Sequence, residues 1–218
     1  MEMPEEALPS DWCSAAPLDK AGAWELMCLV LADLVRLRHF TFRDLGFRNL
    51  HPELVLPGRT RPEVVVLVEK ASMLETARAL HETLGVTAVV SAGVPTLVGS
   101  EFMAASLADR GVREIRTASV CDHDPVGWDM PLVLSRHAER YDLATAGIHR
   151  LVTPERFTPD EIRRLARPLR TTNAAYRTRI ARWVRESGGT GGKALALHAN
   201  HLPLERLIEG MREVLGLA

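Results

Sequence analysis

Two carboxylates separated by one residue follow an apolar stretch in the middle of this 218-residue chain. Asp122 and Asp124 lie in the sequence CDHDPVG, where a Pro and a Gly force the chain to turn. Carboxylates at positions i and i+2 of a strand point to the same side and can hold one hard divalent cation. A second apolar stretch, EVVVLVEK, ends in Glu69 and Lys70. Together the three acids predict a Mg²⁺ site that acts on phosphates, with Mn²⁺ as an alternative ion.

The elements that must position these acids are predicted as alternating strands and helices. The run VVVLV is continuous and β-branched, which is typical of a strand buried on both faces. Further strands are predicted over residues 86–91, 113–120 and 143–152, and helices over 71–84, 97–108 and 129–139. This alternation indicates βαβ units, and therefore an α/β fold with a parallel sheet. Ligands of such sheets bind beyond the carboxyl ends of the strands, where all three acids lie.

The flanking segments are predicted to be helical. Residues 1–60 form an N-terminal helical extension in this interpretation, and residues 61–218 form one domain with additional C-terminal helices. Residues 22–40 read as a helix that is apolar on most of its circumference, so a core or a partner must cover it. The sequence Thr-Pro-Asp-Glu at 158–161 predicts a helix start with a capping box. Two more helices are predicted over residues 172–186 and 203–215.

Three segments of this chain resemble a known family. In order, VVVLVEKASMLETARAL, AGVPTLVGSEFMAASLADRG and TASVCDHDPVGWDMPLVL are similar to the topoisomerase VI A-subunit Toprim domain, and to that of the related meiotic double-strand-break transesterase. The shared pattern is a strand ending in V-E-K, a G-x-P segment before a helix, and a strand ending in D-x-D-P-x-G. The resemblance covers roughly residues 61–200, and Lys193 is a candidate match to a later Lys-containing helix. It implies a Toprim-type sheet in which Glu69, Asp122 and Asp124 ligate Mg²⁺, with Glu69 also a general acid or base.

The chain departs from the family in its tyrosines. In the family, the nucleophile is a Tyr on a winged-helix domain that precedes the Toprim domain. Tyr141 and Tyr176 both follow the DxD motif, so the role of the nucleophile cannot be carried over to either of them. The chain alone is therefore expected to form no covalent adduct with DNA. The resemblance therefore implies the metal-binding component of a strand-breaking assembly, with a partner subunit supplying a tyrosine domain or an ATPase. Two alternatives remain: a stand-alone nuclease that uses water, and a non-catalytic DNA-binding or scaffold protein.

Basic residues near the C-terminus suggest where DNA would lie. The net charge of −1 gives no overall argument for a polyanionic partner, but residues 150–185 contain ten Arg and three acids. One interpretation is that they track a DNA backbone; the other is an exposed helical face in an Arg-biased chain. The predicted DNA-contact residues are Lys70, Arg163, Arg164, Arg177, Arg179 and Arg182.

Several other polar residues are interpreted as structural. His123 lies between the two acids of the DxD motif and is expected to point away from them. His198 and His201 are expected to have capping or surface roles rather than to bind metal. The stretch SGGTGGK at 187–193 lacks the preceding strand and the Ser or Thr of a phosphate-binding loop, so it is interpreted as a flexible linker.

The setting and the assembly are also predicted from composition. Three widely spaced Cys without CxxC or zinc spacing indicate a reduced, cytoplasmic protein, and no apolar run is long enough to span a membrane. A homodimer, or a heteromer, is expected through the apolar segment 22–40, with two acidic clusters facing one DNA duplex.

Overall fold

A computed structural model describes residues 27, 30–31, 33–35, 37–46 and 54–217. The chain divides into two compact units, Met1–Gly46 and Phe47–Ala218. Of the predicted helix 22–40, the structure describes residues 27, 30–31, 33–35 and 37–40; residues 27, 30–31 and 33–35 are helical, and 37–39 form a turn and a bend. The division falls earlier in the chain than the predicted boundary after residue 60, because residues 54–56 already belong to the sheet.

The second unit is built on a five-stranded sheet with the order β1-β3-β2-β4-β5. Its strands are β1 (Leu54–Leu56), β2 (Arg61–Val68), β3 (Val86–Val90), β4 (Glu114–Val120) and β5 (Ala144–Arg150). All neighbouring strands pair in parallel except β1, which runs antiparallel to β3 at one edge. The predicted α/β fold with a mainly parallel sheet is therefore confirmed, whereas strand β1 was not predicted.

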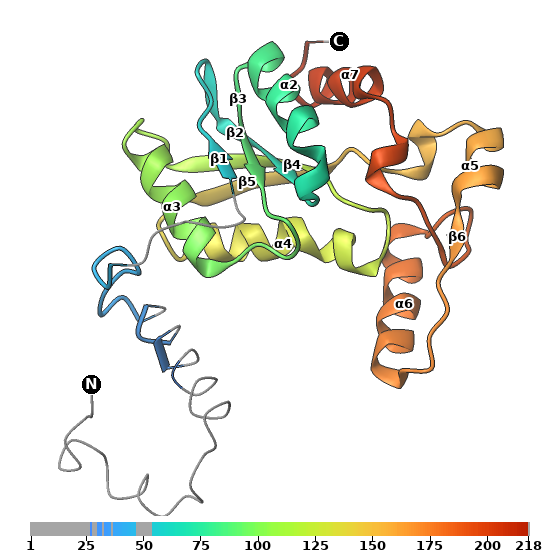
Figure 1. The fold of residues 1–218 in the computed structure, drawn as a ribbon, viewed down its shortest axis with the longest axis horizontal. Coiled ribbons are helices and arrows are strands. Elements are labelled where there is room, and N and C mark those ends of the chain that lie inside the picture. The colour runs from blue at the N-terminus through green and yellow to red at the C-terminus, as the bar shows by residue number, and fades with distance from the viewer. Residues whose placement is uncertain (1–26, 28–29, 32, 36, 47–53, 218) are drawn as a thin grey trace, which may run out of the picture. The chain divides into compact units, whose positions relative to one another are not determined.

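Helices cover both faces of this sheet (Figure 1). The helices α3 (Leu97–Ala108) and α4 (Pro125–Glu139) pack on one face, and α2 (Leu74–Leu84) and α7 (Leu204–Val214) pack on the other. Each face of the sheet packs against its helices through a hydrophobic core, and alternate residues of β2 contribute to the two cores. Val66 and Val68 face α2 and α7, whereas Val65 and Leu67 face α3 and α4. All four are fully buried, as the continuous apolar run predicts.

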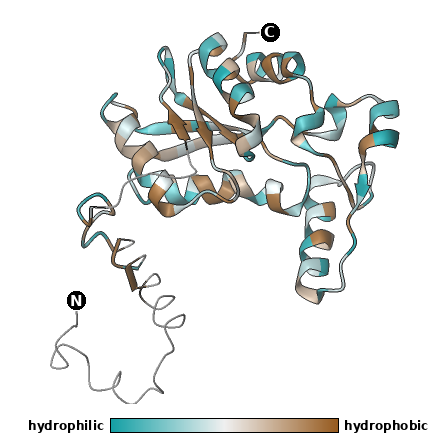
Figure 2. Ribbon diagram, in the orientation of Figure 1, coloured by the Kyte–Doolittle hydropathy of each residue, from teal (hydrophilic) through white to brown (hydrophobic). Residues whose placement is uncertain are grey.

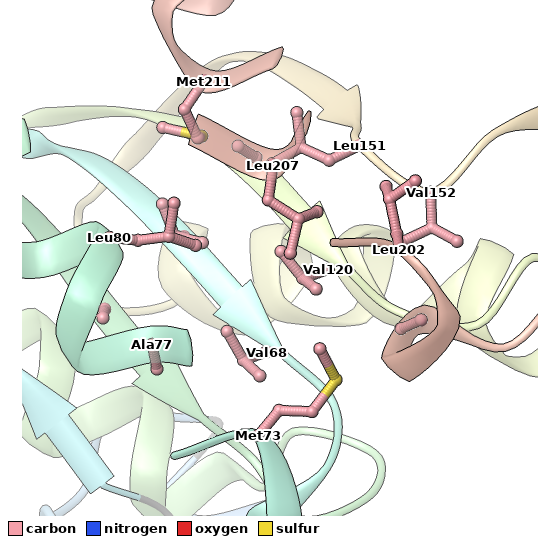
Figure 3. Packing of buried hydrophobic residues seen from close by; sticks show 14 of the residues in the cluster. Val68, Met73, Ala77, Leu80, Val120, Leu151, Val152, Leu202, Leu207 and Met211 are labelled. Carbon is pink, nitrogen blue, oxygen red and sulfur yellow. The ribbon is translucent and has the colours of Figure 1, made fainter. Parts of the chain in front are cut away.

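The core between the sheet, α2 and α7 holds the ends of the two central strands in place (Figure 3). Val68 and Val120, the last residues of β2 and β4, are both fully buried and pair in register. Leu207 and Met211 of α7 pack over them from the C-terminal end of the chain. Hydrophobic colour is concentrated in the middle of the sheet, and hydrophilic colour is frequent on the outer helices (Figure 2). The two strand ends that lead into the acids are thus fixed by packing on both faces.

Helix α4 begins earlier than predicted. It starts at Pro125 rather than at residue 129, because the Asp124 side chain caps the backbone N–H groups of Val126 and Gly127. Pro suits the first helical position, where its missing N–H has no partner to lose. The turn predicted after the DxD motif is therefore the first turn of a helix.

The C-terminal part follows β5 and comprises short helices, short strands and the helices α5 and α6. In order, these elements are η3 (Pro154–Arg156), α5 (Pro159–Leu165), β6 (Arg167–Pro168), α6 (Ala174–Ser187), β7 (Leu195–Ala196) and η4 (Ala199–His201), before α7. A separate short helix, η2 (Ala71–Met73), precedes α2. The capping box at the start of α5 is confirmed, with reciprocal bonds between Thr158 and Glu161. Helix α6 projects away from the sheet (Figure 1).

The glycine-rich stretch 187–193 is a packed turn rather than a flexible linker. Thr190 and Lys193 form an isolated antiparallel bridge, and Gly189 and Thr190 are buried. A Cβ on Gly189 would lie 2.4 Å from the Lys193 carbonyl oxygen, so the close return of the chain requires glycine here. The turn leads α6 back toward the sheet.

No helix in the described part of the chain is long and apolar enough to cross a membrane.

Candidate metal centre

The three predicted acids meet at the carboxyl edge of the sheet. Because Val68 pairs with Val120, the residues that follow β2 and β4 emerge side by side. The Glu69 backbone N–H donates to the Val120 carbonyl at 3.2 Å, and Glu69 Oε2 accepts a hydrogen bond from the Asp122 backbone N–H at 2.7 Å. Asp122 and Asp124 lie close enough to Glu69 for their charges to act on its carboxyl group. Glu69 and the segment that carries Asp122 are therefore in direct contact at this edge.

Asp122 is held by three donors. Its Oδ1 accepts from Lys70 Nζ at 2.7 Å and from the Ala199 backbone N–H at 2.8 Å, and its Oδ2 lies 2.7 Å from His198 Nδ1. Burial alone would raise the pKa of Asp122, but the bonds from Lys70, Ala199 and His198 outweigh it and keep the pKa below its usual value. Asp122 is therefore an ionised carboxylate with fixed oxygens, although it is 7% exposed.

Asp124 does not continue the strand. Its backbone N–H donates to the Asp122 carbonyl oxygen at 2.9 Å, so the chain turns between the two acids, and the expectation that they project as strand neighbours is wrong. Asp124 Oδ1 accepts from the Val126 and Gly127 N–H groups, both at 2.8 Å, as the N-cap of α4. Burial raises the pKa of Asp124, and the Asp122 charge adds to this effect.

Glu69 is the third acid and the most weakly compensated. Burial raises its pKa, and the charges of Asp122 and Asp124 raise it further against the lowering effects of the Asp122 N–H and Lys70. Lys70 itself is bonded to Asp122, so its ammonium group offsets part of the negative charge of the cluster. Such opposed pKa shifts within one small cluster are typical of functional sites.

The three acids match a hard cation in chemical type. Among the described residues, no group of three or more His, Cys, Asp or Glu side chains is already arranged to hold a metal ion. Each of the three acids has at least one oxygen bonded to a protein donor. In the described part of the chain, Glu69 Oε1 and Asp124 Oδ2 accept no hydrogen bond. Carboxylate oxygens are the donors that Mg²⁺ prefers, so the chemistry of these acids suits that ion.

The sequence interpretation missed His198. Residues 195–199 return to the acidic edge from the far end of the chain, where Leu197 and the backbone of His123 form an isolated bridge. His198 was expected to have a capping or surface role, yet its imidazole contacts the central acid. The apolar run ALAL directly before His198 was the available signal, but it does not indicate which acid the His reaches.

His123 lies where it was predicted to lie, pointing away from the acids. It is 3% exposed, and its ring makes edge contacts with Trp183 at 5.0 Å and Trp128 at 6.4 Å between centroids. Its Nε2 lies 3.1 Å from the Gly189 carbonyl oxygen. This histidine therefore joins α4, α6 and the glycine-rich turn behind the site.

The predicted DNA-contact arginines are only partly free. Arg179 and Arg182 of α6 both bind the Asp129 carboxylate of α4, with contacts of 2.9 Å. Arg163 forms an ion pair with Asp160 in the same helix, and Arg177 donates to the Thr172 carbonyl oxygen at 3.1 Å. Arg164 is exposed. Two of the five arginines thus hold α6 against α4, a structural role that the charge count did not indicate.

The hydroxyl groups of both tyrosines have raised pKa values. Burial and the neighbouring Glu101 raise the pKa of Tyr141 to about 12, and its hydroxyl donates to the Leu97 carbonyl oxygen at 3.4 Å. Tyr176 is on α6, and burial followed by the charge of Asp124 raises its pKa. Both effects disfavour the phenolate that attacks phosphorus.

The raised pKa of Glu69 gives a stability prediction. For an acid whose folded pKa lies above its unfolded value of about 4.3, folding is penalised above the folded pKa and unpenalised below about pH 4.3. Glu69→Gln should therefore raise the thermal midpoint of the metal-free protein at pH 7, and this gain should shrink as the pH falls through the folded pKa. Thermal melts followed by circular dichroism check this, with Glu75→Gln on the exposed side of α2 as control. A midpoint that falls at pH 7 would contradict the assignment.

Comparison with family models, with curated proteins and with solved structures found no match to this chain.

Proposed function

We propose that this chain acts on DNA phosphodiesters with Mg²⁺, as the Toprim-type metal-binding component of a strand-breaking assembly related to topoisomerase VI. The observation that carries the proposal is the meeting of Glu69, Asp122 and Asp124 at the carboxyl edge of a mainly parallel sheet. Ligands of such sheets bind at that edge. The order of the V-E-K, G-x-P and D-x-D-P-x-G segments supports the same proposal.

Each acid has a distinct role in this proposal. A Mg²⁺ ion held by the three carboxylates would stabilise the negative charge that develops on the phosphate and on the leaving oxygen. Glu69 takes or gives a proton at the reacting oxygen, since its raised pKa brings it nearer to neutral pH. Lys70 keeps Asp122 ionised through its 2.7 Å contact. Mn²⁺ has the same ligand preferences and is proposed as a substitute.

The DNA backbone is proposed to run along the arginine-rich helices α5 and α6. Arg164 and Arg177 have exposed side chains that can neutralise phosphates. Arg179 and Arg182 form ion pairs with Asp129, but their side chains are 37% and 48% exposed. They add further positive charge to this proposed DNA-binding surface. Breaking both strands of a duplex needs two such sites, so a homodimer remains part of the proposal.

The attacking group is proposed to come from outside this chain. The raised pKa values of Tyr141 and Tyr176 argue against an internal tyrosine nucleophile. A tyrosine domain on a partner protein fits the assembly interpretation, in which an ATPase can be a further component. Water as the nucleophile fits the second candidate, a stand-alone Toprim nuclease. The raised pKa values of the two tyrosines are compatible with both candidates, because neither candidate uses a tyrosine of this chain.

The experiment has two stages, metal binding and strand cleavage. We expect the pure protein to bind Mn²⁺ in a titration followed by electron paramagnetic resonance, and Glu69→Gln to weaken that binding. Supercoiled plasmid with Mg²⁺ or Mn²⁺ then separates the two candidates, because nicking by the chain alone supports the nuclease and metal binding without nicking supports the assembly component. Glu75→Gln, the same change at an exposed position of α2, should behave as the wild type.

Three results would count against the proposal. A wild-type protein that binds no Mn²⁺ lacks the proposed site. Nicking that survives in Glu69→Gln at the wild-type rate arises elsewhere or from a contaminant. A covalent link between labelled DNA and Tyr141 or Tyr176 on a denaturing gel would show an internal nucleophile, against the pKa shifts of both hydroxyls.

A further inference from the structure

The central acid of the site is held from the far end of the chain. His198 Nδ1 lies 2.7 Å from Asp122 Oδ2, and the next residue, Ala199, donates its backbone N–H to the other oxygen at 2.8 Å. Lys70 also binds that other oxygen. His198 is therefore the one side chain in the described part of the chain that fixes Oδ2.

The position of His198 is built by packing on both sides of it. Leu197 and Ala199 are fully buried, so the residue between them is directed out of the core and toward the acidic edge. The Leu197 carbonyl accepts from the His123 backbone N–H at 2.8 Å, which joins this segment to the residue between the two acids. His198 also precedes η4 without capping it through its side chain. The His198 side chain therefore does not cap this helix.

The direction of the hydrogen bond follows from the acid. An ionised carboxylate is an acceptor, so His198 Nδ1 carries the hydrogen and donates it to Asp122. The remaining nitrogen, Nε2, belongs to a side chain that is 42% exposed. A donor at the position of Nδ1 is what Asp122 requires, and an Asn amide nitrogen occupies nearly the same place.

We propose that His198 is a positioning residue that holds the Asp122 carboxylate in the orientation needed for a divalent cation. The inference rests on the proposed function and deepens it by adding a residue distant in sequence. Without the imidazole, Lys70 and the Ala199 N–H still bind Oδ1, but no side chain in the described part of the chain fixes Oδ2, so the carboxylate can rotate. Partners that orient metal ligands in this way typically change metal affinity by about 10- to 100-fold.

Metal affinity tests the inference directly, without relying on cleavage. Mn²⁺ titrations of the full chain, followed by electron paramagnetic resonance, compare wild type with His198→Ala, His198→Asn and His201→Ala. We expect His198→Ala to weaken binding about tenfold or more, and His198→Asn to stay within about threefold of wild type because its amide replaces the Nδ1 donor. His201 is the matched control, since its ring lies 5.6 Å from that of His198 and makes no bond to Asp122 in the described structure.

The outcomes separate this inference from the proposed function. Wild-type affinity in His198→Ala overturns the inference alone, and so does a loss in His198→Asn that equals the loss in His198→Ala. Absence of Mn²⁺ binding in the wild type overturns the proposed function and the inference with it. If His198→Ala does not fold, His198→Gln replaces it, because its amide extends to the place of Nε2 and should not restore the bond.

Discussion

Gly127→Ala is expected to lower the free energy of unfolding by about 3 kcal/mol and to abolish metal binding. Gly127 lies in the first turn of α4, directly against the loop that carries the acids. A Cβ at this position would lie 2.1 Å from the Asp122 carbonyl oxygen and 2.9 Å from its backbone nitrogen. These are backbone atoms and cannot swing aside, so either α4 or the DxD loop must move.

Gly147→Ala supplies the control for this prediction. Gly147 is in the edge strand β5, and its added Cβ would meet one atom, His149 Nε2, at an ordinary contact distance of 3.7 Å. Replacing a strand Gly without steric conflict changes stability by at most about 1 kcal/mol and tends to stabilise. Urea unfolding of both variants measures the difference. Equal stabilities would mean that α4 does not start against Asp122.

The sheet and its helices were predictable because their signals are local. The run VVVLV places both faces of β2 in apolar surroundings, and the predicted helix 97–108 matches α3 residue for residue. The parallel arrangement then places every strand end at one edge, which is why Glu69 and Asp122 could be expected to meet. The contact between Glu69 and the segment of Asp122 could thus be predicted from the general position of ligand sites at strand ends.

The parts that were missed depend on contacts between distant residues. Strand β1 is three residues long and pairs with β3, which no short window of sequence reveals. Asp124 was interpreted by strand alternation, but capping of α4 competes for its side chain and wins, because a Pro follows at the first helical position. His198 reaches Asp122 only through the return of the chain after α6. Hydrogen-bond partners so far apart in sequence leave no periodic signal.

Contacts between residues distant in sequence also explain why the roles of the arginines were not fully predicted. A count of positive charge on residues 150–185 indicates a phosphate-binding surface, but it cannot show that Asp129 of α4 takes up Arg179 and Arg182. Asp122 and Asp129 are therefore a natural pair for comparison. Each accepts from two basic side chains, Lys70 and His198 in one case and two arginines in the other, but they differ in burial.

Asp122→Ala is expected to cost about 3 kcal/mol of stability, whereas Asp129→Ala should cost about 1 kcal/mol or less. Asp122 is 7% exposed, and its removal leaves the Lys70 ammonium and the fully buried Ala199 N–H without their acceptor. Asp129 is 20% exposed, and water can replace it around its more exposed arginines. Urea unfolding at pH 7 measures both losses, and Asp122→Asn, which keeps one acceptor oxygen, should fall between them.

Acid should remove the difference between wild type and Asp122→Ala. The pKa of Asp122 is lowered in the folded protein, so its contribution to stability is complete above the unfolded pKa of about 3.9 and is lost as the pH falls through the lower, folded pKa. The stability gap measured at pH 7 should therefore persist at pH 5 and narrow below about pH 4. A gap that closes already between pH 7 and pH 5 would mean that Asp122 is not held as an ionised carboxylate. Lys70 and His198 would then not be the groups that fix the central acid of the site.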